Sequence, residues 1–416
     1  MKKSYLIRPT FLNLSTINFV LCFVGFQLVT SALLPSMSEN ESITYSVTIP
    51  YRALTLGIFF LIIILNIRKF PKSIPSALLI FLFFWVAWII RMFYDIFICP
   101  VINISGTSQL WLYAFGICLP AIFSIILSYN YIDLEKAFWW ILYLCALILV
   151  LILYSNQTLQ LSSNEIKGRI NANVAISSIS FGHLGAMSIL LGLFSLIKQK
   201  LSLIKKMVSI ILIFLGVFCM LRAGSRSPIL ALFVVLLFWL FSRKNFLWGI
   251  LLLIVVFVLI IIFMDPILNF MGNISPIIES RLREAIYLGN SSGRDTYYSK
   301  AFEAFLDSPL IGKQFAIFFP DGNFDYSHNI ILDALMGLGI VGGIMVVYIL
   351  SAALIKSYHL IKSDDPHFWI CLLLIQQILF NMLSGAFYYN QLLCVLLTLL
   401  FLYKRENVDI NYYKIL

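Results

Sequence analysis

Long apolar stretches recur along almost the whole chain and constrain its fold more than any other feature. A bilayer core about 30 Å thick requires about 20 mostly apolar residues per helix. About twelve stretches meet this requirement, near 15–34, 51–67, 75–94, 108–128, 137–154, 172–197, 207–222, 227–242, 246–264, 329–355, 368–385 and 387–403. Only 12% of the residues are charged, against about a quarter in soluble proteins. The sequence therefore predicts an all-α polytopic membrane protein and excludes a soluble enzyme.

The distribution of lysine and arginine predicts the orientation of these spans. Short loops rich in Lys and Arg stay in the cytoplasm, which places the N-terminus, with Lys2 and Lys3, inside. An even number of spans then returns the C-terminus to the cytoplasm. The cytoplasmic cations are mostly lysine, whereas the outer cations are mostly arginine. Arginine presents a planar fork that matches phosphate oxygens, although outer arginines also snorkel to lipid headgroups.

One outer loop, residues 265–328, is much longer than the others. Apolar residues recur at helical spacing over 276–288 and 296–306, which predicts two amphipathic helices at the membrane surface. Long loops in compact proteins are commonly functional. We therefore divide the chain into spans one to nine (1–264), the large loop (265–328), and the last three spans with the C-terminus (329–416).

The first candidate site lies in the outer turn Leu221–Pro228. Arg222 and Arg226 flank the turn, Ser227 is a suitable N-cap and Pro228 suits a first helical position. A helix N-terminus beside two arginines favours an anion such as a phosphate or diphosphate. The alternative is a capped turn whose arginines only snorkel.

The second candidate site is Ser291-Ser292-Gly293-Arg294-Asp295, at the start of the second loop helix. Arg294 again stands at a Ser/Gly-rich helix start. Pairing with Asp295 would make it a structural salt bridge instead, and the local sequence leaves both readings open.

The third candidate site is Ser327-His328-Asn329, at the outer start of a span. A histidine with a neutral pKa in this position could accept a proton. On a continuous helix Gly339 lies on the same face as His328, and Gly339, Gly342 and Gly343 would let a neighbouring helix pack closely. The alternative is a polar residue at the mouth of a helix.

The remaining polar residues give weaker signals. His183 lies within a span, where an interhelical hydrogen bond is the simpler interpretation. Asp321 and Asp325 are too few for a convincing divalent-cation site, so no metal is expected. The cysteines show no CxxC or metal spacing and suit small core residues.

The three candidate sites, in this order, resemble the motifs of the O-antigen polymerase and O-antigen ligase superfamily. His328-Asn329, nine residues, then Gly339-x-x-Gly342 resembles one signature of that family. Arg222–Ser227 and the run from Ser292 to Gly312 are similar to two others. The resemblance covers roughly residues 165–345, and the whole chain in topology.

This resemblance implies a GT-C-like, inverting, metal-independent glycosyltransferase without a cofactor, in the bacterial inner membrane with its active site facing the periplasm. The donor would be a glycan on undecaprenyl diphosphate. Arg226 and Arg294 would hold the diphosphate, and His328 would activate the acceptor hydroxyl. The predicted binding residues are Arg169, Arg222, Ser227, Arg281 and Asn329.

The sequence leaves the acceptor open. A polymerase would join the glycan to another lipid-linked repeat unit, aided by a chain-length regulator and a flippase, whereas a ligase would use lipid A–core. We favour the polymerase because such enzymes are more numerous. A flippase or transporter is the alternative from another class, although the sequence shows no internal repeat. No nucleic-acid partner is implied.

Overall fold

The computed structural model describes residues 13–34, 41–69, 71, 73–98, 107–157, 171–198, 201–242, 259, 262–289, 293–319 and 324–404. Among these, 8 helices are long and apolar enough to cross a membrane, and shorter apolar helices span Arg226–Phe241, Trp369–Leu383 and Gln391–Leu402. The prediction of an all-α polytopic membrane protein is confirmed. The span expected at 246–264 falls almost entirely outside the described residues.

The chain divides into two compact units, each assembled from separate stretches of sequence. Unit 1 comprises Met1–Thr55, Ile132–Asn290 and Tyr358–Gln376, and unit 2 comprises Leu56–Tyr131, Ser291–Ser357 and Gln377–Leu416. Helices α3 (Glu41–Asn66), α15 (Ile330–Lys362) and α16 (Trp369–Leu383) contribute residues to both units. The large loop 265–328 likewise supplies residues to both.

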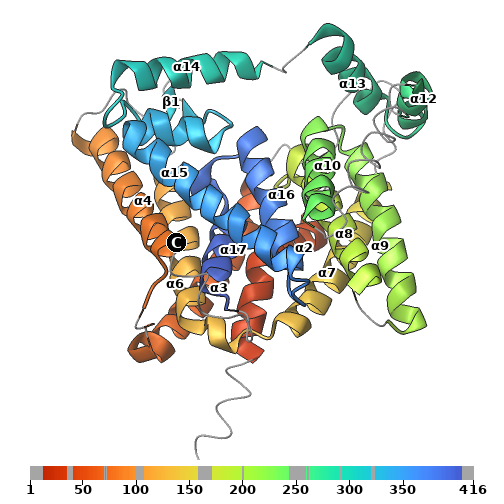
Figure 1. Ribbon diagram of the computed structural model, residues 1–416, viewed down its shortest axis with the longest axis horizontal. Coiled ribbons are helices and arrows are strands. Elements are labelled where there is room, and N and C mark those ends of the chain that lie inside the picture. The colour runs from red at the N-terminus through yellow and green to blue at the C-terminus, as the bar shows by residue number, and fades with distance from the viewer. Residues whose placement is uncertain are drawn as a thin grey trace, which may run out of the picture. The chain divides into compact units, whose positions relative to one another are not determined.

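The other described elements of unit 1 are η1 (Leu21–Gly25), α2 (Phe26–Leu33), α7 (Leu134–Gln157), α8 (Ser178–Lys198), α9 (Leu203–Arg222), α10 (Arg226–Phe241), α12 (Met264–Ile274) and α13 (Pro276–Leu288). Helices α8 and α9 lie side by side (Figure 1). A Cβ atom at Gly185 would overlap the carbonyl of Gly216, and the reverse also holds. Small residues at this crossing therefore let the two backbones touch.

The other described elements of unit 2 are η2 (Ile67–Lys69), α4 (Ser76–Phe93), η3 (Tyr94–Ile98), α5 (Thr107–Trp111), η4 (Leu112–Cys118), α6 (Leu119–Ser128), η5 (Tyr129–Tyr131), α14 (Arg294–Asp307), β1 (Ile317–Phe318), β2 (Phe324–Asp325), η6 (Phe387–Tyr389) and α17 (Gln391–Leu402). Elements η1, η3 and η4 are π-helices. Aromatic rings fill much of the core of unit 2. Trp88 stacks on Tyr388 with ring centroids 5.5 Å apart, and Phe84 meets Phe387 at 4.8 Å.

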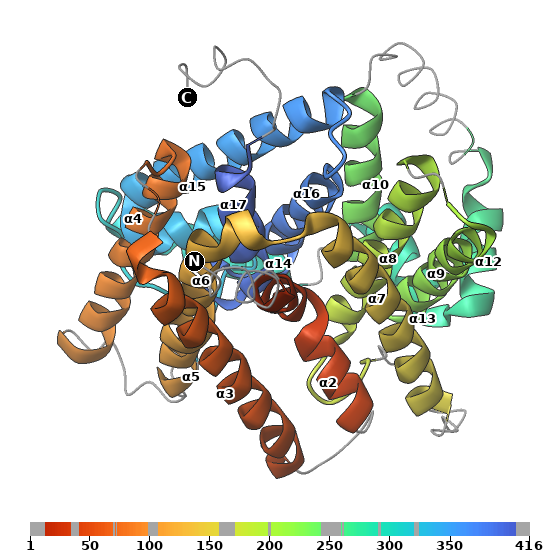
Figure 2. The same cartoon turned by 90° about the horizontal axis from the view of Figure 1, so that it is seen from below.

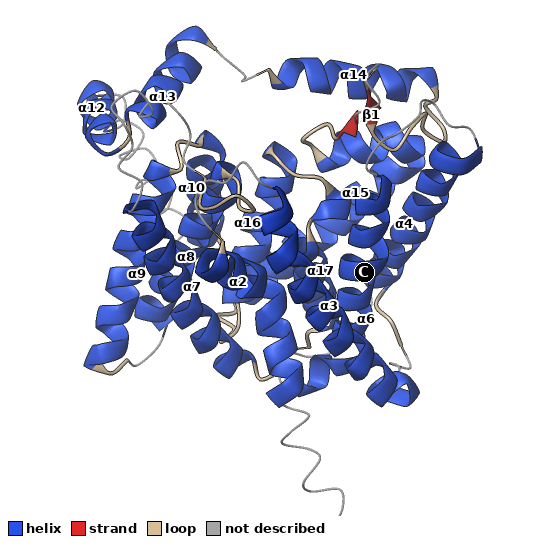
Figure 3. Ribbon diagram, turned by 180° about the vertical axis from the view of Figure 1, so that it is seen from behind, coloured by secondary structure: helices blue, strands red, loops and turns tan. Residues whose placement is uncertain are grey.

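The predicted amphipathic helices of the outer loop are present as α13 and α14. Two further elements were not expected: helix α12, and an antiparallel hairpin that pairs Ile317 with Asp325 and Phe318 with Phe324. Figure 3 shows this hairpin beneath α14. Helices α12 and α13 of unit 1 run close to each other (Figure 2). Arg283 of α13 joins them through Asp265 of α12 at 2.8 Å, and it also pairs with Glu279 of its own helix at 3.0 Å.

Several span boundaries differ from the predicted ones, and the starts of α3 and α8 are explained by local hydrogen bonds. Helix α3 begins at Glu41, well before residue 51, because its polar residues satisfy themselves within the helix: Ser46 Oγ donates to the carbonyl of Ile43 and Thr48 Oγ1 to that of Thr44. Helix α8 begins at Ser178, after residue 172, because Asn173 Oδ1 accepts from the backbone N–H groups of Ala175 and Ile176 and forms a turn.

Candidate functional site

The turn before α15 holds His328 in an unusual backbone conformation. His328 has φ 62°, in the left-handed region that non-glycine residues seldom occupy. The next residue, Asn329, caps the helix, since its Oδ1 accepts from the backbone N–H of Ile331 at 3.0 Å and of Leu332 at 3.2 Å. Asn329 thus has a structural task, and its binding of glycan stays a prediction.

A buried carboxylate holds this turn in place. Asp333 is only 1% exposed, and its Oδ1 accepts from the backbone N–H of Ser327 at 2.8 Å. Ser327 Oγ in turn donates to the carbonyl of Asn329 at 2.9 Å. Strained conformations persist where their surroundings over-determine them, and these bonds provide that constraint on both sides of His328.

The imidazole of His328 lies between two tyrosine rings. Its centroid is 4.5 Å from that of Tyr326 and 5.2 Å from that of Tyr297. Burial is the main cause that lowers the pKa of His328, and the charge of Arg294 lowers it further. Asp325 and a hydrogen bond to the backbone of Ser384 raise it, but the net pKa lies below the ordinary 6.5. The ring is therefore mainly neutral near pH 7 and able to accept a proton.

Arg294 and His328 share a partner in unit 2. Arg294 is the first residue of α14, after Gly293 with φ 77°. Its Nη2 donates to Ser384 Oγ at 2.6 Å, and Ser384 also bonds to His328 through its backbone. The structure thus brings together two predicted site residues, and it adds Ser384. The polar Ser384-Gly385 break between two apolar stretches was the only sequence signal for this residue.

Helix α14 is positioned by a small apolar cluster. Ala301 and Ala304 pack against Ile317 of β1 and Met336 of α15, and Tyr297 and Leu332 lie against this group. In Figure 1, α14 runs above β1 and the first part of α15. The alanines leave room for close packing of α14, and Tyr297, about one turn after Arg294, extends this contact toward the start of the helix.

The expectation of an uninterrupted helix from His328 to Gly343 is wrong. Helix α15 breaks at Gly339, which has φ 63° and ψ −155°. The loop after α14 fills the break: the carbonyl of Pro309 accepts from Ile340 N at 2.8 Å. A Cβ atom at Gly339 would overlap the carbonyl of Leu310, and one at Gly312 would overlap the backbone of Gly337. A loop, and not a neighbouring helix, therefore makes the close approach.

The other two glycines of this segment, Gly342 and Gly343, are buried. The atoms nearest to an added Cβ belong to α15 itself, namely to Leu338 and Ala334 for Gly342 and to Leu335 for Gly343. Contact with a neighbouring helix at these two positions stays a prediction.

Arg91 and Asp95 hold the same loop through hydrogen bonds to its backbone. Arg91 bonds Asp95 at 2.7 and 3.0 Å, and its Nη1 donates to the carbonyl of Gly312 at 3.0 Å. Asp95 Oδ2 accepts from Phe315 N at 2.8 Å. Arg91 could have snorkelled to the lipid headgroups, but its guanidinium group is bonded to protein groups instead.

In unit 1 the turn before α10 carries Arg226. Ser225 is the N-cap and Arg226 the first helical residue, so the cap predicted at Ser227 is wrong by two positions. The left-handed Gly224, with φ 64°, reverses the chain early and shifts the helix start. Arg226 Nη1 donates to the carbonyl of Arg281 in α13 at 3.0 Å, which joins these two predicted residues.

The other predicted residues of unit 1 have simpler positions. Arg222 is the last residue of α9. Ser227 is buried, with its Oγ 3.4 Å from that of Ser225. Arg169 lies outside the described residues, as does Asp321. Within the described part of the chain, no three His, Cys, Asp or Glu side chains form a group that could hold a metal ion.

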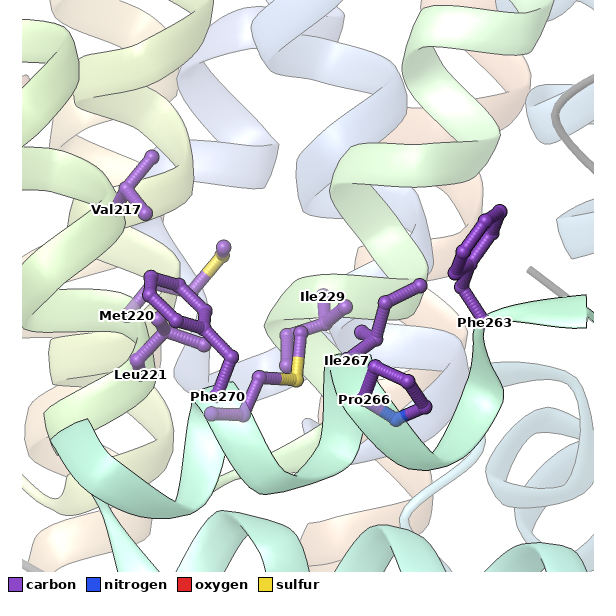
Figure 4. Close-up of a pocket in the computed structure, with 9 residues that line it drawn as sticks. Val217, Met220, Leu221, Ile229, Phe263, Pro266, Ile267 and Phe270 are labelled. Atoms are coloured by element: carbon purple, nitrogen blue, oxygen red, sulfur yellow. The ribbon is translucent and has the colours of Figure 1, made fainter. Parts of the chain in front are cut away.

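An apolar cavity of about 490 Å³ lies among α9, α10 and α12 of unit 1 (Figure 4). Its lining is Val217, Met220, Leu221, Ile229, Phe263, Pro266, Ile267, Phe270 and Met271. Leu221 precedes Arg222 in the chain, and Ile229 lies about one helical turn after Arg226. The cavity therefore adjoins the turn that carries the two arginines.

Residues 209–347 match the family model described as O-antigen ligase. The resemblance to the O-antigen polymerase and ligase superfamily is confirmed. The matched segment contains Arg226, Arg294 and His328, together with the loop and helix break described above. No curated protein matches the chain significantly. The match supports an enzyme of the glycosyltransferase kind, and it does not separate polymerase from ligase.

Proposed function

We propose that this protein is a surface-polysaccharide polymerase. It would transfer a glycan from undecaprenyl diphosphate to a hydroxyl group of another lipid-linked repeat unit, at the periplasmic face of the bacterial inner membrane. Both termini would lie in the cytoplasm. The observation that carries the proposal is the neutral His328 beside Arg294, within the segment that matches the O-antigen ligase family.

The reaction follows from these groups. The acceptor hydroxyl attacks the anomeric carbon of the donor sugar while its proton passes to the imidazole of His328. The bond between the anomeric carbon and the diphosphate oxygen breaks, and attack from the opposite side inverts the configuration. Negative charge then develops on the diphosphate, where arginine forks stabilise it without a metal ion. We propose this role for Arg294 in unit 2. For unit 1 we propose that Arg226 binds diphosphate, with Arg222, Arg281 and Ser227 as further ligands.

The apolar cavity of unit 1 is a suitable place for part of the isoprenoid chain. All of its lining side chains, including the two methionines, are apolar. A hydrocarbon chain bound there would therefore not cover any polar side chain of the cavity. Its neighbours Arg222 and Arg226 would hold the diphosphate to which such a chain is attached.

A ligase that transfers glycan to lipid A–core is the second candidate, because the matching family bears that description. The phenotype of a deletion strain separates the two. Loss of a polymerase leaves a single repeat unit on lipid A–core, whereas loss of a ligase strands long chains on undecaprenyl diphosphate. A flippase fits less well, because the matching family is described as a ligase, and loss of a flippase should give neither phenotype.

Three variants test the site residues in that strain. His328→Asn, Arg294→Gln and Arg226→Gln should each abolish the polymer ladder on gels while the protein still inserts. Asparagine tolerates the left-handed backbone conformation better than alanine, so His328→Asn reports on chemistry more than on folding. Retention of the full ladder by all three variants would show the site assignment to be wrong.

A further inference from the structure

Three tyrosine rings extend away from His328 in unit 2. Tyr326 lies 5.8 Å from Tyr389, and Tyr389 meets Tyr113 edge-on, with centroids 4.6 Å apart and an interplanar angle of 86°. We call Tyr113, Tyr326 and Tyr389 the tyrosine ledge. They come from η4, from the segment after β2 and from η6, so distant parts of the sequence form one surface.

The ledge differs from the aromatic core behind it. Tyr388 is 2% exposed and stacked on Trp88, whereas all three ledge tyrosines are only half-buried. Burial raises the pKa of Tyr326 to about 12, with Asp325 as a further cause, and also raises that of Tyr389. The phenol groups of Tyr326 and Tyr389 therefore stay neutral near pH 7. A phenol hydroxyl can both donate and accept a hydrogen bond.

The backbone at Tyr113 is also unusual. Tyr113 belongs to the π-helix η4, Leu112–Cys118. Such wide turns are rare and occur often at functional sites. Here the wide turn carries one ring of the ledge, Tyr113.

The chemistry of the ledge matches a sugar ring. A pyranose has an apolar face of C–H groups, which packs on the negative face of an aromatic ring, and a rim of hydroxyl groups, which pairs with phenol and carboxylate oxygens. The three tyrosines and Asp325 offer both features within reach of His328. An isoprenoid chain would contact only the rings and could form no hydrogen bond with the phenol and carboxylate oxygens.

We propose that the tyrosine ledge binds the sugar that carries the attacking hydroxyl, with Tyr389, the middle ring, as its main contact. This inference rests on the proposed function, because it assigns the ledge to the acceptor of that reaction. It makes the three tyrosines positioning residues for the acceptor, in addition to the residues that the family resemblance suggests.

The test is a binding measurement that needs no turnover. Oligosaccharide fragments of the surface polysaccharide from the strain that carries the gene are titrated into the full-length protein in detergent, and saturation-transfer NMR reports the bound sugar. Tyr389→Leu and Tyr113→Leu remove the ring but keep an apolar side chain, and Tyr389→Phe keeps the ring. Tyr154→Ala is the control, since Tyr154 is 71% exposed on α7 in unit 1.

We expect Tyr389→Leu and Tyr113→Leu to weaken binding about tenfold, which is the effect of losing one good contact. Tyr389→Phe should stay within about threefold of wild type, and Tyr154→Ala should bind as wild type does. Wild-type affinity in both leucine variants, or no binding by the wild-type protein at millimolar sugar, would overturn the proposal.

The same titration separates this inference from the proposed function. His328→Asn should bind the sugar normally and produce no polymer. If His328→Asn still produced polymer while the leucine variants lost binding, the proposed chemistry would fail and the ledge would stand.

Discussion

His328 owes its properties to side chains that are distant in the sequence. Its ring rests on Tyr297 and Tyr326, and its pKa is lowered mainly by burial and partly restored by Asp325. A general base must be neutral to act. The pH at which activity falls on the acid side of the pH profile therefore reports the pKa of His328, and so the balance between burial and the charge of Asp325.

Replacing Asp325 should shift that pH in a defined direction. The Asp325 carboxylate raises the pKa of His328, so Asp325→Asn should lower it and extend activity to lower pH. Polymerisation rates at subsaturating acceptor between pH 4.5 and 8 provide the measurement. Asp307→Asn, whose carboxylate pairs with Lys313, is the control, and an upward shift in Asp325→Asn would refute the electrostatic account.

Asp333 should act through the turn and not through chemistry. Asp333→Ala leaves the Ser327 N–H without its acceptor, which costs about 1–3 kcal/mol. We expect a lower melting temperature and a weaker ladder. Asp333→Asn keeps an acceptor oxygen and should recover most of both. If asparagine were as inactive as alanine, the charge of Asp333 itself would be required.

Local sequence signals predicted Arg294 and His328 as site residues but gave no indication of their partners. A Ser/Gly-rich helix start and a polar helix mouth are both visible within a few residues. Ser384, Asp333 and Tyr389 gave no comparable signal, because their roles depend on contacts across unit 2 that no local pattern contains.

At the scale of elements, the break in α15 is the feature that hydropathy could not predict. The sequence stays apolar on both sides of Gly339, so hydropathy gives no sign of a break. The residues that fill the break, Pro309 and Leu310, are themselves apolar. The periodicity identifies where helices lie, but it does not reveal a backbone angle. By contrast, α13 and α14 were predictable because each has one polar and one apolar face.

Substitution of Gly339 should disturb the packing of the loop on α15. The Cβ atom in Gly339→Ala would overlap the Leu310 carbonyl at a positive φ, so we expect a loss of several kcal/mol and of the ladder. Thermal unfolding in detergent gives the comparison.

Two controls separate the causes. Gly289→Ala has a positive φ but free space around the Cβ atom, and Gly57→Ala has free space and no positive φ. Gly289→Ala should cost about 1 kcal/mol and Gly57→Ala should be neutral or stabilising. Equal melting temperatures for Gly339→Ala and Gly57→Ala would contradict the described contact.

At the scale of the molecule, the sidedness predicted from lysine and arginine can be tested by labelling. Ser299 on α14 and Ser363 after α15 are both exposed. Ser299→Cys should react with a membrane-impermeant thiol reagent in intact spheroplasts, whereas Ser363→Cys should react only after lysis. The described native cysteines are buried, so the unmodified protein is the background control. The reverse pattern would invert the proposed orientation.

The division of the chain into interleaved stretches has a consequence for biosynthesis. Unit 1 contains stretches that are translated before most of unit 2 but closes only at Gln376, and unit 2 needs residues from Gln377 onward. Helices that are translated early must therefore remain in the membrane without the helices against which they pack, because those are translated much later. A stop codon anywhere before Gln376 leaves both units unfinished, whereas a stop codon between α16 and α17 interrupts the second unit alone.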